Sequence, residues 1–176
     1  TLHVRSKSGA LDAGFMRAGS HDLIEIDACP ILAPPLKQAP ELARALGGAI
    51  PDLSGSLDIQ ITATNSGLDC DIRGIKELSL DARMNLGELA EHHDLARVSV
   101  GGEAVAERRR PILKFGIADI TPPPGGFLQA TVAGEETLAG LVLEKVGTAK
   151  RAADLFSGIG TFALRLAEQT AVTAVD

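Results

Sequence analysis

The sequence has no tryptophan, no tyrosine and only five phenylalanines among its 176 residues. Proteins that bind single-stranded nucleic acid by stacking its bases use exposed aromatic side chains, so that mode of binding is not indicated. With 17 basic and 23 acidic residues, the formal net charge is -6, and a general attraction to a polyphosphate backbone is not indicated either. Any nucleic-acid binding must therefore depend on local features.

Cysteine is also scarce, because only Cys29 and Cys70 are present, too few and too far apart for the disulfide scaffold of a small secreted protein. The sequence shows neither a charged-then-apolar leader nor an apolar run long enough to span a membrane. We therefore expect a cytoplasmic protein that has no membrane partner and is a monomer. Its 45% apolar composition predicts a globular fold with a hydrophobic core.

Up to about Gly126, short alternating patterns and turn residues predict an α+β region with mostly antiparallel hairpins. The turn residues include Ser8-Gly9, Asn65-Ser66-Gly67 and Gly101-Gly102. Two helices are expected, one from Leu36 to Leu46 and one that begins after an N-cap at Ser79 and ends near His92. The expected strands are Leu2–Arg5, Ala10–Met16, Asp22–Asp27, Leu57–Ala63, Leu68–Arg73, Leu95–Val100, Glu103–Glu107, Ile112–Phe115 and Ile117–Ile120.

The segment Pro122-Pro123-Pro124-Gly125-Gly126 is the strongest break in the pattern and predicts a domain boundary. The expected domains are therefore 1–126, an α+β domain, and 127–176. After the boundary we expect a short strand over Phe127–Ala130 and a helix over Glu135–Val146. Gly147 is in the usual position to end that helix.

The stretch Asp154–Phe162 predicts a nucleotide-cofactor loop. An apolar strand over Ala152–Phe156 leads into Gly158 and Gly160, and helical spacing begins at Phe162. Glycine suits such a turn because it tolerates unusual dihedrals and lets a ligand approach the backbone. A second strand is expected over residues 171–175, and Asp176 follows it, 18 positions after Gly158 (176 minus 158). In nucleotide-binding folds, an acidic residue about 20 positions after the glycines binds a ribose hydroxyl.

Two cofactors compete for this loop. Residues 158–163 formally match the G-x-G-x-x-G/A pattern of a dinucleotide site, which would indicate an NAD(P)-dependent oxidoreductase. Asp154, however, lies inside a strand that should be wholly apolar in a pyrophosphate-binding protein. That acid resembles the first motif of S-adenosylmethionine-dependent methyltransferases.

Four segments together resemble the RNA uracil-C5 methyltransferase family, most closely the bacterial branch that modifies 23S ribosomal RNA and carries an iron-sulfur cluster. Their order and approximate spacing also agree with the family. The region from about Pro51 to Arg110 is similar only in general character. The matching segments are Gly14–Asp22, the Cys-Pro turn in Ile26–Leu32, Phe127–Gln129, and Asp154–Phe162.

The resemblance implies an α+β central domain followed by the beginning of an α/β, Rossmann-like class I methyltransferase domain. It implies methyl transfer from S-adenosylmethionine to C5 of a uridine in structured RNA, ribosomal or transfer. In such enzymes a cysteine thiolate adds to C6 of the uracil and a carboxylate later removes the C5 proton. By family position both groups would follow Asp176, so we expect this chain to be a fragment with no catalytic residue of its own.

The resemblance also implies which residues contact the cofactor. Thr161 and Asp176 depart from the Asn and Glu that are frequent in close relatives, although both keep hydrogen-bonding capacity with a shorter reach. Gly158 and Gly160 would provide close backbone approach. The complete expected set is Gln129, Phe156, Gly158, Gly160, Thr161 and Asp176.

Cys29 is a candidate metal ligand through the resemblance alone. In the cluster-bearing branch this cysteine is the fourth thiolate of a [4Fe-4S] site, and the other three lie further toward the N-terminus. Those three are absent from the present sequence. By itself, a cysteine is more often a small buried hydrophobic residue, and we interpret Cys70 in that way.

Two further clusters have a functional and a structural interpretation. His92-His93 with Asp94 could bind a metal, but adjacent histidines at a helix end usually face water. Arg108-Arg109-Arg110 could contact phosphate, but a solvated charge run is the more frequent outcome. A non-enzymatic module that positions RNA or holds a cluster is the third hypothesis for the whole chain.

Overall fold

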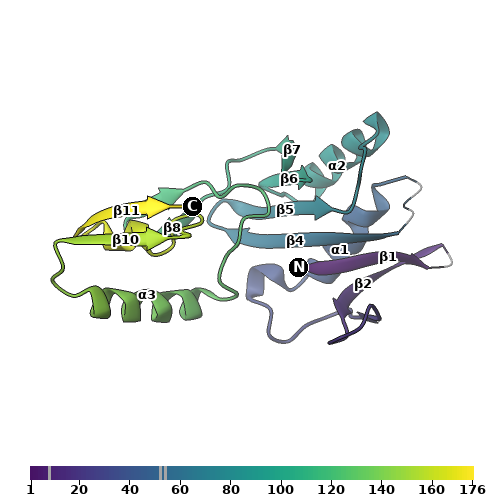
Figure 1. The fold of residues 1–176 in the computed structure, drawn as a ribbon. Coiled ribbons are helices and arrows are strands. Elements are labelled where there is room, and N and C mark those ends of the chain that lie inside the picture. The colour runs from purple at the N-terminus through teal and green to yellow at the C-terminus, as the bar shows by residue number, and fades with distance from the viewer. Residues whose placement is uncertain (8, 52, 54) are drawn as a thin grey trace. The chain divides into compact units, whose positions relative to one another are not determined.

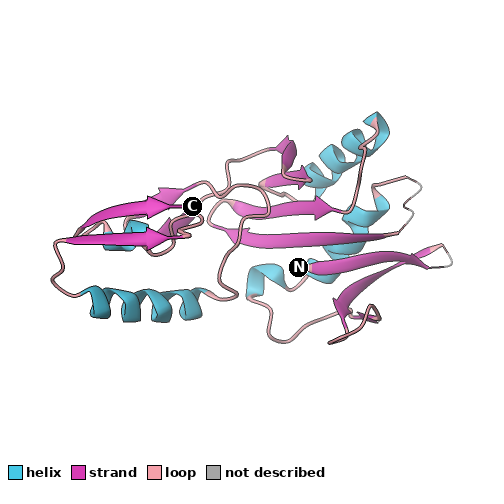
Figure 2. Cartoon of the chain, viewed as in Figure 1, coloured by secondary structure: helices cyan, strands magenta, loops and turns pink. Residues whose placement is uncertain are grey.

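The computed structural model describes residues 1–7, 9–51, 53 and 55–176, so the expected turn at Ser8 lies partly outside the described residues. The chain divides into two compact units, Thr1–Pro111 and Ile112–Asp176 (Figures 1 and 2). The sequence placed the domain boundary after Gly126, whereas the contacts group residues 112–126 with the second unit. Within the described residues, no helix is both long and apolar enough to cross a membrane.

The first unit is built on a seven-stranded sheet in the order β3-β2-β1-β4-β5-β6-β7. Every neighbouring pair is antiparallel except β5 and β6, which are parallel because α2 connects them. The predicted hairpins β1–β2, β4–β5 and β6–β7 are confirmed. The strands are β1 Leu2–Lys7, β2 Ala10–Met16, β3 Leu23–Glu25, β4 Ser56–Thr64, β5 Gly67–Arg73, β6 Arg97–Val100 and β7 Glu103–Glu107.

Two helices contribute to the core of this unit. The 3-10 turn Pro34–Leu36 precedes α1, Ala39–Gly48, in which Pro40 occupies the first turn, where proline is tolerated. Helix α2 covers Leu80–His92, and the predicted N-cap is confirmed because Ser79 Oγ accepts a hydrogen bond from Ala82 N at 3.2 Å. The buried core joins apolar residues of both helices to those of the sheet: Leu2, Val4, Leu42, Leu46, Leu57, Ile59, Cys70, Ile72, Leu86 and Val98.

An ion pair is buried between the two parallel strands of this sheet. Asp69 of β5 lies opposite Arg97 of β6 in the register. Arg97 donates from Nε to Oδ1 at 2.9 Å and from Nη2 to Oδ2 at 2.8 Å, and both side chains are buried. The neighbouring carboxylate of Asp71 accepts from Arg73 Nε at 2.9 Å and from Gly102 N at 3.2 Å. Charged groups at this depth require such partners.

The second unit contains two small sheets and two helices. β8 Leu113–Phe115 pairs antiparallel with β9 Ala118–Ile120, and β10 Arg151–Leu155 pairs in parallel with β11 Ala171–Val175. Helix α3 covers Val132–Val146 and is capped by Thr131, whose Oγ1 accepts from Gly134 N at 3.0 Å. Gly147 ends that helix with φ 53°, as predicted. Helix α4 is short, Ala163–Leu166.

Two predictions for the second unit are wrong in part. Residues 127–130 form no strand; they run as an irregular segment into the cap of α3. The helix expected to begin at Phe162 is reduced to the short α4, because the chain turns after Leu166, whose carbonyl oxygen accepts from Thr170 N at 3.0 Å. The parallel β10 and β11 strands and the glycine turn between β10 and α4 are confirmed.

Candidate cofactor site

The segment between β10 and α4, residues 156–162, is a tight turn with three left-handed residues. Phe156, Gly158 and Gly160 have φ values of 60°, 53° and 89°. Glycine adopts such angles at little cost, but an aromatic residue there is strained and is held only by its surroundings. The turn is fixed internally because Gly160 N donates to Ser157 O at 2.9 Å.

The end of β11 holds this loop in place. Ser157 N donates to Val175 O at 3.0 Å, and Gly158 N donates to Asp176 Oδ1 at 3.2 Å. β10 and β11 are parallel neighbours, so their carboxyl ends lie at the same edge of the sheet, where ligands of α/β proteins bind. The acid that the sequence predicted for a ribose contact is therefore also a structural partner of the loop.

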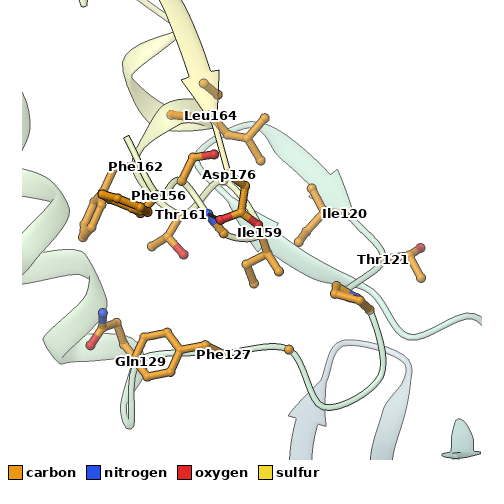
Figure 3. Close-up of a pocket in the computed structure, with 17 residues that line it drawn as sticks. Ile120, Thr121, Phe127, Gln129, Phe156, Ile159, Thr161, Phe162, Leu164 and Asp176 are labelled. Carbon is orange, nitrogen blue, oxygen red and sulfur yellow. Dashed lines mark hydrogen bonds between the residues drawn. The ribbon is translucent and has the colours of Figure 1, made fainter. Parts of the chain in front are cut away.

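All six predicted cofactor residues line one cavity of about 800 Å³. In Figure 3, Phe127 and Gln129 lie on one side of this space, and Phe156, Thr161 and Asp176 lie on the other. The structure thus brings Gln129 close to residues of the 156–176 segment. The predicted residues are Gln129, Phe156, Gly158, Gly160, Thr161 and Asp176, and the cavity is also lined by Ile120, Thr121, Pro123, Gly126, Phe127, Ser157, Ile159, Phe162, Ala163, Leu164 and Ala174.

The sequence did not assign residues 120–126 to this site. Pro123 and Gly126 line the cavity, although their composition predicted a linker between domains. Gly126 N donates to Pro123 O at 3.0 Å, which closes a turn within the segment. Proline and glycine are frequent in linkers and in binding loops alike, so composition alone does not distinguish the two.

Open space lies beside the first glycine of the loop. A Cβ atom placed on Gly158 would meet no atom within 4 Å, whereas one on Gly160 would lie 3.1 Å from the Leu164 side chain. The side chain of Phe156, the first residue of the loop, is 91% exposed. The backbone at Gly158 and an aromatic side chain are thus both accessible to a ligand.

Asp154 of β10 carries a buried oxygen, Oδ2, that has no hydrogen-bond partner in the described part of the chain. Buried carboxylate oxygens are normally paired, so an unpaired one indicates a donor that a ligand or water would supply. The sequence singled out this acid because it interrupts an otherwise apolar strand. Asp154 lies four residues before Gly158 in the chain, and it is not among the residues that line the cavity.

The two cysteines are in different surroundings in the first unit. Cys29 is half-buried in the turn after β3, where Leu32 N donates to its carbonyl oxygen at 3.2 Å. Cys70 lies in the core on β5, and burial, together with the charge of Asp69, raises the pKa of its thiol. The interpretation of Cys70 as a core residue is therefore consistent with its environment. Across the described ranges, no group of three or more His, Cys, Asp or Glu side chains could hold a metal ion.

Alkylation should distinguish the two cysteines. In the metal-free native protein, we expect iodoacetamide at pH 8 to modify Cys29 and to leave Cys70 unmodified, because a buried thiol with a raised pKa forms little reactive thiolate. Peptide mass spectrometry after short labelling would measure both sites. Denatured protein, in which both thiols react, is the control. Equal labelling of Cys70 and Cys29 in the native protein would contradict the buried position of Cys70.

Two residues of the arginine run 108–110 form hydrogen bonds within the first unit. Arg108 Nη1 and Arg109 Nη1 both donate to Asp94 Oδ1, at 2.7 and 2.6 Å, and Arg109 Nε donates to Ser66 O at 2.8 Å. The hydrogen bonds from Arg109 and then Arg108 lower the pKa of Asp94. These contacts attach the end of β7 to the turn after α2.

The curated relatives of this chain are RNA methyltransferases. It is 42% identical over 172 residues to an uncharacterized RNA methyltransferase of Brucella suis, a match that covers 98% of this chain and 41% of the relative. It is 29% identical over 178 residues to the 23S rRNA (uracil(1939)-C(5))-methyltransferase of Shewanella piezotolerans, covering 94% of this chain and 39% of that protein. These matches support the resemblance to the RNA uracil-C5 methyltransferase family that the sequence motifs indicated.

The chain spans about two fifths of the length of the curated relatives that it matches. The scan against protein-family models found no match. A solved structure, the tRNA (uracil-54, C5)-methyltransferase of Pyrococcus abyssi in complex with S-adenosyl-L-homocysteine, matches with a TM-score of 0.63. The match covers 99% of this chain and 53% of that one at 14% identity, so it supports the α+β fold.

Proposed function

We propose that the loop between β10 and α4 binds S-adenosylmethionine, in a protein that methylates C5 of a uridine in structured RNA. The observation that carries the proposal is the single cavity lined by all six residues that the motifs indicated. Relatives named as RNA methyltransferases support the reaction type. The bound S-adenosyl-L-homocysteine of the structural neighbour supports the choice of cofactor.

The residues around the cavity suit the parts of such a cofactor. Gly158 leaves its backbone accessible, and the second oxygen of Asp176 would accept hydrogen bonds from ribose hydroxyls while the first holds Gly158 N. Phe156 would provide an apolar surface for the adenine ring. Gln129 and Thr161 would supply polar groups that orient the ligand. When bound, S-adenosylmethionine supplies a methyl group on a positively charged sulfur.

Charge favours this cofactor over a dinucleotide. The carboxylate of Asp176 contacts the glycine turn through Gly158 N, and Asp154 precedes Gly158 by four residues, with one buried oxygen that has no partner in the described chain. These negative groups attract a ligand that carries sulfonium and ammonium charges and repel a pyrophosphate. An NAD(P)-dependent oxidoreductase is therefore the weaker alternative.

We propose that the nucleophile and the base of the methyl-transfer reaction are not among residues 1–176. The thiol of Cys70 is buried and its pKa is raised, so it is unsuited to attack on uracil C6. We expect the nucleophilic cysteine and the carboxylate base to follow Asp176, and we expect Cys29 to be one of four thiolates of a [4Fe-4S] site. The proposed substrate is 23S ribosomal RNA, with transfer RNA as the alternative, and the proposed location is the cytoplasm.

Calorimetry tests the cofactor. We expect the protein, expressed at the full length that its gene encodes, to bind S-adenosylhomocysteine and not NAD. Tight binding of NAD alone would reject the methyltransferase and favour the oxidoreductase. Affinity for RNA without binding of either cofactor would favour a module that only positions RNA.

A further inference from the structure

Arg165 of α4 lies at the centre of a set of contacts beside the cavity. Its Nη2 donates to Glu135 Oε1 of α3 at 2.7 Å, and its Nη1 donates to the carbonyl oxygen of Thr161 at 2.9 Å. The guanidinium carbon also lies 5.2 Å from the ring centre of Phe115, a distance typical of a cation–π contact. One side chain thus connects the loop, α3 and β8.

This arginine joins the two sides of the cavity. Thr161 lies on the loop side, and Glu135 lies in the first turn of α3, directly after the segment that carries Gln129 on the other side. The cap at Thr131 fixes the start of α3, so the position of Glu135 is coupled to the end of the Gln129 segment. Arg165 therefore links the Thr161 side of the cavity to the first turn of α3.

The ion pair between Arg165 and Glu135 is largely shielded from water. The side chains of Arg165 and Glu135 are 12% and 10% exposed. A guanidinium can donate to a carboxylate and to a carbonyl at once because its donors are arranged in a rigid fork. A second contact restrains the same helix end, because Glu168 Oε1 accepts from Ile117 N at 3.1 Å in the β8–β9 turn.

We propose that Arg165 and Glu135 form a positioning pair that sets the separation of Thr161 and Gln129 and so the affinity for the cofactor. This inference rests on the proposed binding of S-adenosylmethionine. Neither residue touches the cavity itself, since the residues that line it do not include them. They act through the Thr161 carbonyl and through the start of α3.

The test compares Arg165→Gln, Glu135→Gln and the double variant in the full-length protein. We expect each single variant to raise the dissociation constant for S-adenosylhomocysteine by about tenfold, and the double variant to be no weaker than Arg165→Gln, because the two residues act as a unit. Arg165→Lys should recover part of the affinity, since lysine keeps the charge and loses the fork. Arg151→Gln and Glu136→Gln, at exposed positions of the same unit, are the matched controls.

Hydrogen exchange provides a readout that does not depend on the cofactor. Without ligand, we expect residues 156–162 to exchange faster in both single variants, with residues 97–107 unchanged. If Arg165→Gln fails to fold, Glu135→Gln still tests the pair, because it leaves the contacts of Arg165 with Thr161 and Phe115 in place. Wild-type affinity and unchanged exchange in both single variants would overturn the proposal. If the wild-type protein failed to bind S-adenosylhomocysteine while residues 156–162 still exchanged faster in both single variants, the proposed cofactor would be overturned. The role of the pair in positioning the loop would be kept.

Discussion

Replacing Gly158 with alanine should weaken the binding of S-adenosylhomocysteine by about a hundredfold, equivalent to about 2.7 kcal/mol. Two effects add. Gly158 has φ 53°, a left-handed conformation that costs other residues roughly 1–2 kcal/mol, so we expect the unliganded loop of the variant to relax away from it and binding to restore it at that cost. The new methyl group would also occupy the open space beside the loop, where the cofactor is expected to approach the backbone. Calorimetric titration of the folded variant would measure the loss.

Gly101→Ala is the matched control for this substitution. Gly101 lies in the β6–β7 turn with φ 58°, and a Cβ atom there would also meet no atom within 4 Å. The backbone strain should therefore be similar, while cofactor binding should be unchanged. If the two variants lost affinity equally, or if Gly158→Ala bound normally, the open space at Gly158 would not be the cofactor position.

Replacing Asp69 with alanine should lower the free energy of unfolding by about 3–5 kcal/mol, which is the usual cost of breaking a buried ion pair. The reason is that Arg97 would keep its charge in the interior after losing both hydrogen bonds to Asp69. Arginine keeps its proton even without these bonds, so the guanidinium cannot escape the penalty by becoming neutral. Chemical denaturation followed by circular dichroism would measure the change.

Two comparisons sharpen this prediction. Asp58→Ala removes a half-exposed carboxylate on β4 that contacts His3 Nδ1 at 2.6 Å, and exposed pairs of this kind contribute about 0–1 kcal/mol. The double variant Asp69→Leu/Arg97→Met replaces both charges with apolar groups and should cost less than Asp69→Ala alone. A change under about 0.5 kcal/mol for Asp69→Ala would contradict the buried pairing.

Local patterns were sufficient to predict most elements. The hairpins follow from alternation and turn residues, such as Asn65-Ser66-Gly67 between β4 and β5. The cap at Ser79 and the end of α3 at Gly147 follow from chemistry within a few residues. The loop after β10 was recognisable because strand, glycines, helix and acid occur in a fixed order.

Contacts between distant residues were not predictable in this way. Arg165 and Glu135 are 30 positions apart, and nothing in either local pattern indicates that they pair. In the alternating pattern of β5, Asp69 stands at a polar position that would normally face solvent, yet residues on both faces of β5 are buried. Position 127 was expected to open a strand from its apolar character, but the segment instead lines the cavity. In each case tertiary neighbours decide the outcome.

The most direct test of the cofactor loop is a nuclear magnetic resonance titration of protein labelled with ¹⁵N at glycine. S-adenosylhomocysteine should shift the amide signals of Gly158 and Gly160 and leave that of Gly101 in place, because only the first two belong to the cavity. If saturating ligand left the Gly158 and Gly160 signals unchanged, the central claim that this turn holds the cofactor would be contradicted, even if the ligand bound elsewhere.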